Sequence, residues 1–268
     1  MKIGIVPMSA KPFHAGHNSL IRFAAGIELL EPLVKLGYAK QENDQVNVYV
    51  SYSSRGVKKR TKTIRGIKHR FEEPIPGEAP VFGQDMEYIW DNILTAENLQ
   101  YTDTNVDIIT PNMSQIRSPV LAGFKVADAF RDAYNLGEPY WTDPISDIRY
   151  ETVETAITFY CGEDDASRYS DQVMLNYYGE MFESGLISVL PIPRVVAISG
   201  TQMRQYLMSG DIESLKEMLP HTLSEENKEK IATTLIKSVE LGRPSSQIYS
   251  SNESLIRSYV NNSLFYLL

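Results

Sequence analysis

Residues 2–17, which read KIGIVPMSAKPFHAGH, combine an apolar run with a loop that contains two histidines. The opening run is short, apolar and β-branched, which predicts a buried first strand over Lys2–Val6. A helical pattern begins at Asn18, and Pro32 must end or restart that helix after Leu30. A strand, a loop and a helix in this order predict the start of a βα unit.

Strand and helix signals alternate as far as about residue 210. Further strands are predicted at Val46–Tyr52, Val106–Thr110, Thr155–Tyr160 and Ile187–Pro191, where β-branched and aromatic residues gather. Helices are predicted over Asp85–Leu94, Pro119–Leu136, Ser170–Glu183 and Gln202–Ser209. This alternation predicts an α/β fold, with about five parallel strands and helices on both faces. We expect one domain over residues 1–210 and a small helical C-terminal region over residues 211–268.

Composition places the chain among ordinary globular proteins, with 268 residues, 43% of them hydrophobic and 22% charged. No apolar run approaches the roughly 18 residues of a membrane span, and a lone Lys2 before a short apolar run does not resemble a signal peptide. Cys161 is the single cysteine, so an intramolecular disulfide and a multi-cysteine metal site are excluded. We expect a cytoplasmic protein, with Cys161 buried at a strand end.

Charge is unevenly distributed along the chain. The formal net charge is −8, but residues 55–70, RGVKKRTKTIRGIKHR, hold eight Lys and Arg and no acid. The remainder carries 18 basic against 34 acidic side chains, a net charge of −16, which repels nucleic acids in general. Residues 53–82 as a whole predict a long loop. Three interpretations of its basic part stay open: a solvated loop, a mobile lid over a polyphosphate, and, least favoured, a contact for RNA.

Two histidines lie between the first predicted strand and the helix after it. His14 and His17 flank Ala15-Gly16, where open parallel sheets bind ligands and helix N-termini offer free N–H groups to phosphate. Imidazole donates hydrogen bonds to phosphate oxygens on which charge develops, and Gly16 permits a close approach of backbone to ligand. The competing interpretations are partly buried turn histidines and half of a metal site, for which no companion ligands are evident.

Residues 198–204, ISGTQMR, form a second candidate anion site after the fifth predicted strand. Ser199 and Thr201 are residue types that cap helices, and Gly200 leaves backbone N–H groups accessible. Arg204 falls in the first helical turn, where its guanidinium suits a phosphate. An ordinary capped helix with an exposed arginine is the competing interpretation.

Taken together, HAGH and ISGTQMR closely resemble the two signature motifs of the nucleotidylyltransferase superfamily, HxGH and ISxTxxR. The resemblance covers about residues 1–210 and implies a Rossmann-like sheet. Members transfer AMP or CMP from a nucleoside triphosphate to a phosphate or acid acceptor and release pyrophosphate. The resemblance therefore implies ATP as a substrate and Mg²⁺ bound through its triphosphate, with no metal ligands from the protein.

The resemblance also implies roles for individual residues. Those implied in the chemistry are His14, His17, Lys11 and Arg204. Lys11 stands where many members have an acid or Gln. Those implied to hold the nucleotide are Pro7, Met8, Ser9, Gly16, Gly162, Asp164, Ile198, Ser199 and Thr201. Asp164 matches the end of a Gly-x-Asp motif that lies near the ribose and base in the family, and the neighbouring Asp165 is a second candidate for this role. An equal alternative is that these carboxylates only stabilise the N-terminus of a helix.

Within the superfamily, PFHAGH is similar to adenylyltransferases that act on nicotinamide mononucleotide. ISGT followed by an arginine also resembles some ATP sulfurylases, and VPMSAKPFHAGH resembles the start of pantothenate synthetases, whose remaining motifs are not evident. The favoured acceptor is therefore nicotinamide mononucleotide, which would give NAD. The residues assigned to the acceptor are Ser51, Ser53, Arg55, Lys58 and Trp90, of which Trp90 is also interpreted as a core residue.

The sequence thus predicts an enzyme that transfers AMP from ATP to a small phosphorylated acceptor. A cytidylyltransferase, another adenylyltransferase and a non-catalytic nucleotide- or RNA-binding protein stay open as alternatives. No membrane partner is expected, and the oligomeric state is left open.

Overall fold

The computed structural model describes residues 1–102, 104–110, 118–194, 196 and 198–245. The chain divides into two compact units. The first comprises residues 1–51, 95–199 and 220–223, and the second residues 52–94, 200–219 and 224 onward. Residues 52–94 thus group with the chain from residue 200 onward, apart from residues 220–223. The domain boundary expected near residue 210 stays a prediction, and the end of the region 211–268, from residue 246, lies outside the described residues.

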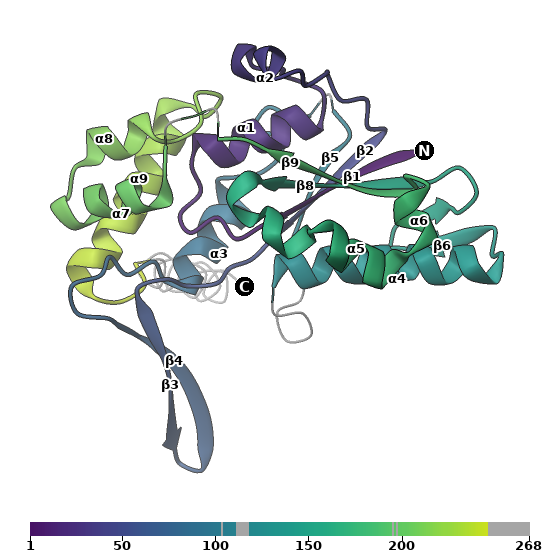
Figure 1. The fold of residues 1–268 in the computed structure, drawn as a ribbon. Coiled ribbons are helices and arrows are strands. Elements are labelled where there is room, and N and C mark those ends of the chain that lie inside the picture. Colours follow the sequence, from purple (N-terminus) through teal and green to yellow (C-terminus); the bar gives the residue numbers. More distant parts are fainter. Residues whose placement is uncertain (103, 111–117, 195, 197, 246–268) are drawn as a thin grey trace, which may run out of the picture. The chain divides into compact units, whose positions relative to one another are not determined.

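A five-stranded sheet forms the centre of the first unit (Figure 1). Its strands are β1 (Lys2–Met8), β2 (Gln45–Val50), β5 (Val106–Ile109), β8 (Ala156–Gly162) and β9 (Ile187–Ile192). They lie in the order β5-β2-β1-β8-β9, and each neighbouring pair is parallel. The predicted α/β Rossmann-like fold is confirmed, and each of the five predicted strands is present with slightly shifted ends.

Helices cover both faces of this sheet. The helices α1 (Ala15–Ala24) and α4 (Pro119–Leu136) both contact β1, from opposite faces (Figure 1). Burial on both faces explains why β1 has a continuous apolar sequence rather than an alternating one. Ile5 and Phe159 of neighbouring strands are fully buried and belong to one cluster with Phe130 of α4. The helix predicted from Asn18 to Leu30 ends earlier, at Ala24, and Pro32, which a first helical turn tolerates, lies in a separate helix, α2 (Glu31–Lys35).

A short hairpin that the sequence did not predict belongs to the first unit. It consists of β6 (Tyr140–Thr142) and β7 (Arg149–Glu151). The buried Asp143 carboxylate beside it accepts hydrogen bonds from Tyr49 Oη of β2 at 2.6 Å and from Ile145 N at 2.7 Å. Asn47 of β2 donates to Tyr150 Oη at 3.2 Å. Buried polar atoms stabilise a fold only when they are paired, and this network links the hairpin to the sheet.

The predicted helix over Ser170–Glu183 is replaced by shorter pieces. A 3-10 helix, η1 (Glu163–Tyr169), follows β8 directly, and α5 (Asp171–Tyr178) and α6 (Glu180–Glu183) come after it.

Helices make up much of the second unit as far as it is described. They are α3 (Gly83–Asn92), α7 (Gly200–Ser209), α8 (Ile212–Glu217) and α9 (Glu225–Leu241). The carboxylate of Asp85 in α3 is fully buried and accepts hydrogen bonds from Ser238 Oγ and Ser245 Oγ. Ser238 lies in α9, so these bonds join the two helices.

The basic segment forms a hairpin rather than the irregular loop expected over residues 53–82. The strands β3 (Val57–Ile64) and β4 (Ile67–Pro74) pair in antiparallel register and extend away from the helices of the same unit (Figure 1). Arg65 and Gly66 join them with φ of +50° and +79°, the combination required by a two-residue type I′ turn. Lys59 pairs with Glu72, and the Arg60 side chain contacts Glu73 at 3.0 Å. Glu72 and Glu73 thus offset part of the repulsion among the Lys and Arg side chains of residues 55–70.

Among the described residues, the helices are all too short or too polar to cross a membrane.

Candidate nucleotide-binding site

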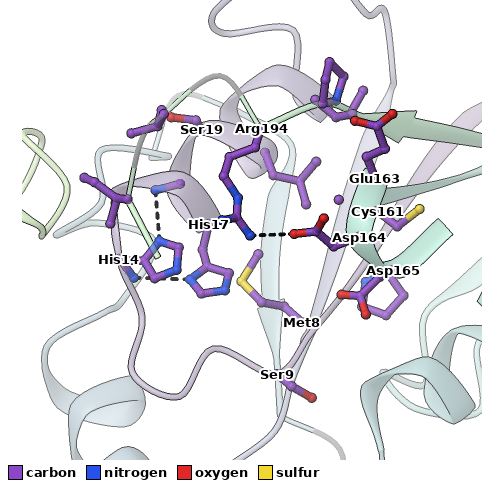
Figure 2. Close-up of a pocket in the computed structure, with 18 of the residues that line it drawn as sticks. Met8, Ser9, His14, His17, Ser19, Cys161, Glu163, Asp164, Asp165 and Arg194 are labelled. Atoms are coloured by element: carbon purple, nitrogen blue, oxygen red, sulfur yellow. Dashed lines mark hydrogen bonds and ion pairs between the residues drawn. The ribbon is translucent and has the colours of Figure 1, made fainter. Parts of the chain in front are cut away.

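A cavity of about 260 Å³ lies in the first unit, where β1, β8 and β9 end (Figure 2). β1 is the strand at which the order of the sheet reverses, because its partners are β2 on one side and β8 on the other. Open parallel sheets bind ligands in the crevice beyond the carboxyl ends of the strands at such a point. The cavity is therefore the place in this fold where a ligand is expected.

Many of the residues singled out in the sequence line this cavity. They are Pro7, Met8, Ser9, His14, Gly16, His17, Gly162, Asp164 and Ile198. Lys11 lies in the loop between β1 and α1 but is not part of the lining. Segments that are far apart in the sequence meet here because β1 and β8 are neighbours in the sheet.

The two motif histidines cap α1 reciprocally. His14 is the N-cap residue, and its Nδ1 accepts a hydrogen bond from Gly16 N at 3.2 Å. In return, His14 N donates to Nδ1 of His17 at 3.3 Å. This is a capping box in which imidazoles replace the usual hydroxyl and carboxylate groups. The ring centroids lie 3.8 Å apart, so each ring restricts the other.

This arrangement determines which ring nitrogen of each histidine carries the proton. Because both Nδ1 atoms accept hydrogen bonds, the proton of each neutral ring resides on Nε2, which is then a donor. Burial, the neighbouring His14 and the cation of Arg194 lower the pKa of His17 well below 6.5. His17 is therefore neutral at neutral pH. The site presents imidazole N–H donors without placing a positive charge on His17.

Two arginines that the sequence analysis did not single out complete the lining. Arg194, just after β9, donates from Nη2 to Asp164 Oδ2 at 2.5 Å (Figure 2). Arg168 of η1 contacts Asp165 at 3.3 Å. The position of Arg194 directly after the fifth strand was the available signal. Both carboxylates near the expected ribose position are thus paired with guanidinium groups.

The second motif, ISGTQMR, spans the two units. Ile198 lines the cavity and Ser199 is the last residue of the first unit before residue 220, whereas Thr201 and Arg204 lie in α7 of the second unit. Arg204 Nη2 donates to Thr201 Oγ1 at 3.0 Å. Burial and the neighbouring Arg55 lower the pKa of Arg204, whereas the carboxylate of Glu78 acts to raise it. Two cations, Arg55 and Arg204, therefore act on each other within the second unit.

The residues assigned to the acceptor are divided between the two units. Ser51 is buried at the end of β2 in the first unit, whereas the other four belong to the second unit. Arg55 and Lys58 are exposed at the base of the β3–β4 hairpin. Trp90 is 2% exposed in α3, which supports its interpretation as a core residue. Its assignment to the acceptor stays a prediction.

In the part of the chain that the structure describes, no group of three or more His, Cys, Asp or Glu side chains is arranged to hold a metal ion. Cys161 is a single buried thiol in the cavity wall.

Comparisons with known proteins give little further information. No protein-family model and no curated protein match the chain. Among solved structures, the crystal structure of Thermotoga maritima TmcAL bound with alpha-thio ATP is similar, at 14% identity and a TM-score of 0.38. The match covers 91% of this chain and 57% of that chain, so this chain spans little more than half the length of TmcAL. Likeness at this level carries no functional argument.

Proposed function

We propose that this protein is a nucleotidyltransferase that transfers AMP from ATP to a small phosphorylated acceptor and releases pyrophosphate. The reciprocal cap of His14 and His17 beside the cavity carries the proposal. It fixes the proton of each neutral ring on Nε2 at the positively polarised end of α1, an end suited to a polyphosphate. The resemblance of HAGH and ISGTQMR to the superfamily's motifs supports the same reaction.

The reaction requires no nucleophile from the protein. An oxygen of the acceptor phosphate attacks the α-phosphorus of ATP, and the bond from that phosphorus to the oxygen bridging the β-phosphorus breaks. Pyrophosphate leaves with the electron pair. Such a displacement depends on aligning the reactants and on donors that stabilise the charge on the phosphate oxygens. His14 and His17 would supply donors, and Arg194 and Arg168 would supply positive charge from the lining.

The remaining roles follow from the resemblance and stay proposals. Thr201 and Arg204, with Ser199, would hold the β- and γ-phosphates. Asp164 would receive the ribose hydroxyls. Mg²⁺ would be carried by the triphosphate, in keeping with carboxylates that are already paired with arginines.

Nicotinamide mononucleotide is the proposed acceptor, again on the resemblance of PFHAGH. Arg55 and Lys58, exposed cations of the second unit, are the proposed contacts for its phosphate.

The experiment is to incubate the protein with ATP or CTP, Mg²⁺ and a panel of phosphorylated metabolites that includes nicotinamide mononucleotide. Pyrophosphate release is measured, and the products are weighed by mass spectrometry. An AMP adduct of one acceptor is the expected result. Loss of one preorganised donor lowers turnover by about 10²–10³, so His17→Ala should fall in this range. His221→Ala, an exposed histidine elsewhere in the chain, is the matched control.

Three other results of this experiment would contradict parts of the proposal. A CMP adduct would identify a cytidylyltransferase instead. ATP binding without a product from any acceptor would favour a non-catalytic nucleotide-binding protein. Near-normal turnover of a folded His17→Ala variant would contradict the proposed role of the histidine pair.

A further inference from the structure

The β3–β4 hairpin is a basic ribbon with an excess of unpaired charge. Residues 57–74 contain seven Lys and Arg against Glu72 and Glu73. The stretch Lys58–Arg70 is exposed throughout, although isolated two-stranded ribbons gain little stability of their own. Glu72 anchors the base of the ribbon, because it accepts hydrogen bonds from Ser54 Oγ at 2.5 Å and Gly83 N at 2.9 Å. The ribbon is therefore held at its base and accessible along its length.

The strand register sorts its side chains onto two faces. Directly paired residues point to the same face, and neighbours along a strand point to opposite faces. Arg60 pairs with Phe71 and Lys62 pairs with His69, so these four side chains share one face. The opposite face carries Lys59, Thr61, Thr63, Lys68 and Arg70, with Glu72 paired to Lys59. Cations lie on both faces, but the rings are confined to one of them.

The face with the rings also exposes apolar groups. Phe71 is 40% exposed between the cations, and Ile64 and Ile67 beside the turn are 47% and 63% exposed. A ribbon that only balanced the charge of an acidic chain would have no need for an exposed aromatic ring in such a place. Cations on β3 that lie beside rings on β4 match a ligand that offers phosphates and flat bases together.

We propose that the face of the β3–β4 hairpin formed by Arg60, Lys62, His69 and Phe71 binds single-stranded nucleic acid, an activity separate from the proposed transfer reaction. The lysine and arginine side chains contact backbone phosphates, and a base stacks on Phe71. A single strand is favoured over a duplex because the bases of a duplex are already stacked and do not present their flat faces to a side chain. The acidic remainder of the chain confines this binding to the hairpin.

The test is fluorescence anisotropy with the full chain and a labelled 12-nucleotide RNA of mixed sequence, at 50 and 200 mM salt. The DNA of the same sequence and the RNA annealed to its complement are the comparison ligands. We expect the single strands to bind more tightly than the duplex, and we expect affinity to fall as salt is raised. Tighter binding of the duplex, or no binding at 50 mM salt, would overturn the proposal.

Variants of the two hairpin faces distinguish a binding site on one face from a general electrostatic attraction of RNA to the whole hairpin. Arg60→Gln with Lys62→Gln removes two cations beside the rings, and Lys59→Gln with Lys68→Gln removes two from the opposite face. The first pair should reduce the slope of log affinity against log salt by about 1.4, and the second by clearly less. Equal effects of both pairs would overturn the assignment to one face.

Phe71 tests stacking without a change of charge. Phe71→Ala should lower affinity for the RNA about 5- to 100-fold and leave the salt slope unchanged, whereas Phe71→Trp should retain binding. The side chain is exposed, so neither variant should lower the melting temperature appreciably. Unchanged RNA affinity in Phe71→Ala would overturn the proposal. A change of oligomeric state in that variant, without RNA binding by the parent chain, would instead identify a second copy of the chain as the partner.

Discussion

Arg194 donates a hydrogen bond to the carboxylate of Asp164 at 2.5 Å, joining the segments that follow β9 and β8. The same guanidinium is one of the charges that lower the pKa of His17. A single cation thus acts on a carboxylate proposed to contact the ribose and on a histidine proposed to contact the triphosphate.

Arg194→Gln should therefore raise the pKa of His17. Burial and His14 still act on the ring in the variant, so its pKa should stay below 6.5. Titration of the imidazole signals by NMR measures the change. Arg168→Gln is the control, because Arg168 pairs with Asp165 and is not among the groups that shift His17. Equal shifts in both variants would contradict the specific role of Arg194.

The lowered pKa of His17 predicts a loss of stability in acid. The folded state holds His17 neutral below pH 6.5, whereas the unfolded chain takes up a proton there, so stability is complete above pH 6.5 and falls as the pH decreases. Between pH 7 and pH 5 the free energy of unfolding should fall by up to about 2 kcal/mol more in the parent protein than in His17→Gln. Urea unfolding at several pH values measures this difference. Parallel pH profiles would show that His17 titrates normally.

Gly16→Ala should separate stability from nucleotide binding. A Cβ at this position would lie 3.1 Å from Cε1 and 3.2 Å from Nδ1 of His14, so the ring must move. Alanine is otherwise the better helix former by about 1 kcal/mol. We expect an unchanged or higher melting temperature together with weaker ATP binding, measured by calorimetry. Full ATP affinity in this variant would contradict the role of the His14 ring.

Cys161 provides a chemical probe of the cavity. Burial and the carboxylate of Asp165 raise the pKa of its thiol to about 11, so only about a thousandth is ionised at pH 8. Alkylation by iodoacetamide should be slow in the folded protein, accelerate about tenfold for each pH unit, and slow further when ATP is bound. Intact mass measures the modified fraction, and unfolded protein provides the rapid control. Alkylation that is insensitive to saturating ATP would place the nucleotide elsewhere.

The central sheet could be predicted because its strands are short apolar runs bounded by turn residues. Ile3–Val6 is buried on both faces, and such strands have a continuous apolar sequence, whereas Ile187–Pro191 at the sheet edge is half-buried beyond Ile187. The β3–β4 hairpin carries no such signal. Its strands are stabilised by cross-strand pairs such as Arg60 with Glu73 and by the Arg65-Gly66 turn, and these depend on register rather than on hydrophobicity.

In the candidate site, too, the interactions between residues close in sequence could be predicted, and those between distant residues could not. His14 and His17 could be singled out because their interaction is contained in four consecutive residues. The pairing of Arg194 with Asp164 joins residues 30 positions apart and follows only from the adjacency of β8 and β9. The burial of Trp90 likewise depends on how its helix packs, although its place in an amphipathic pattern favoured a core residue over an exposed ring.

The ribbon of β3 and β4 has two open edges, since the sheet that it forms contains two strands in the described part of the chain. Open edges with unpaired N–H and C=O groups invite pairing with the same edge of another molecule, and dense lysine and arginine side chains oppose this by mutual repulsion. The charges of residues 58–70 therefore also protect the protein from aggregation through this ribbon. Preparations in which these charges are neutralised should form aggregates at lower protein concentrations than the parent chain does.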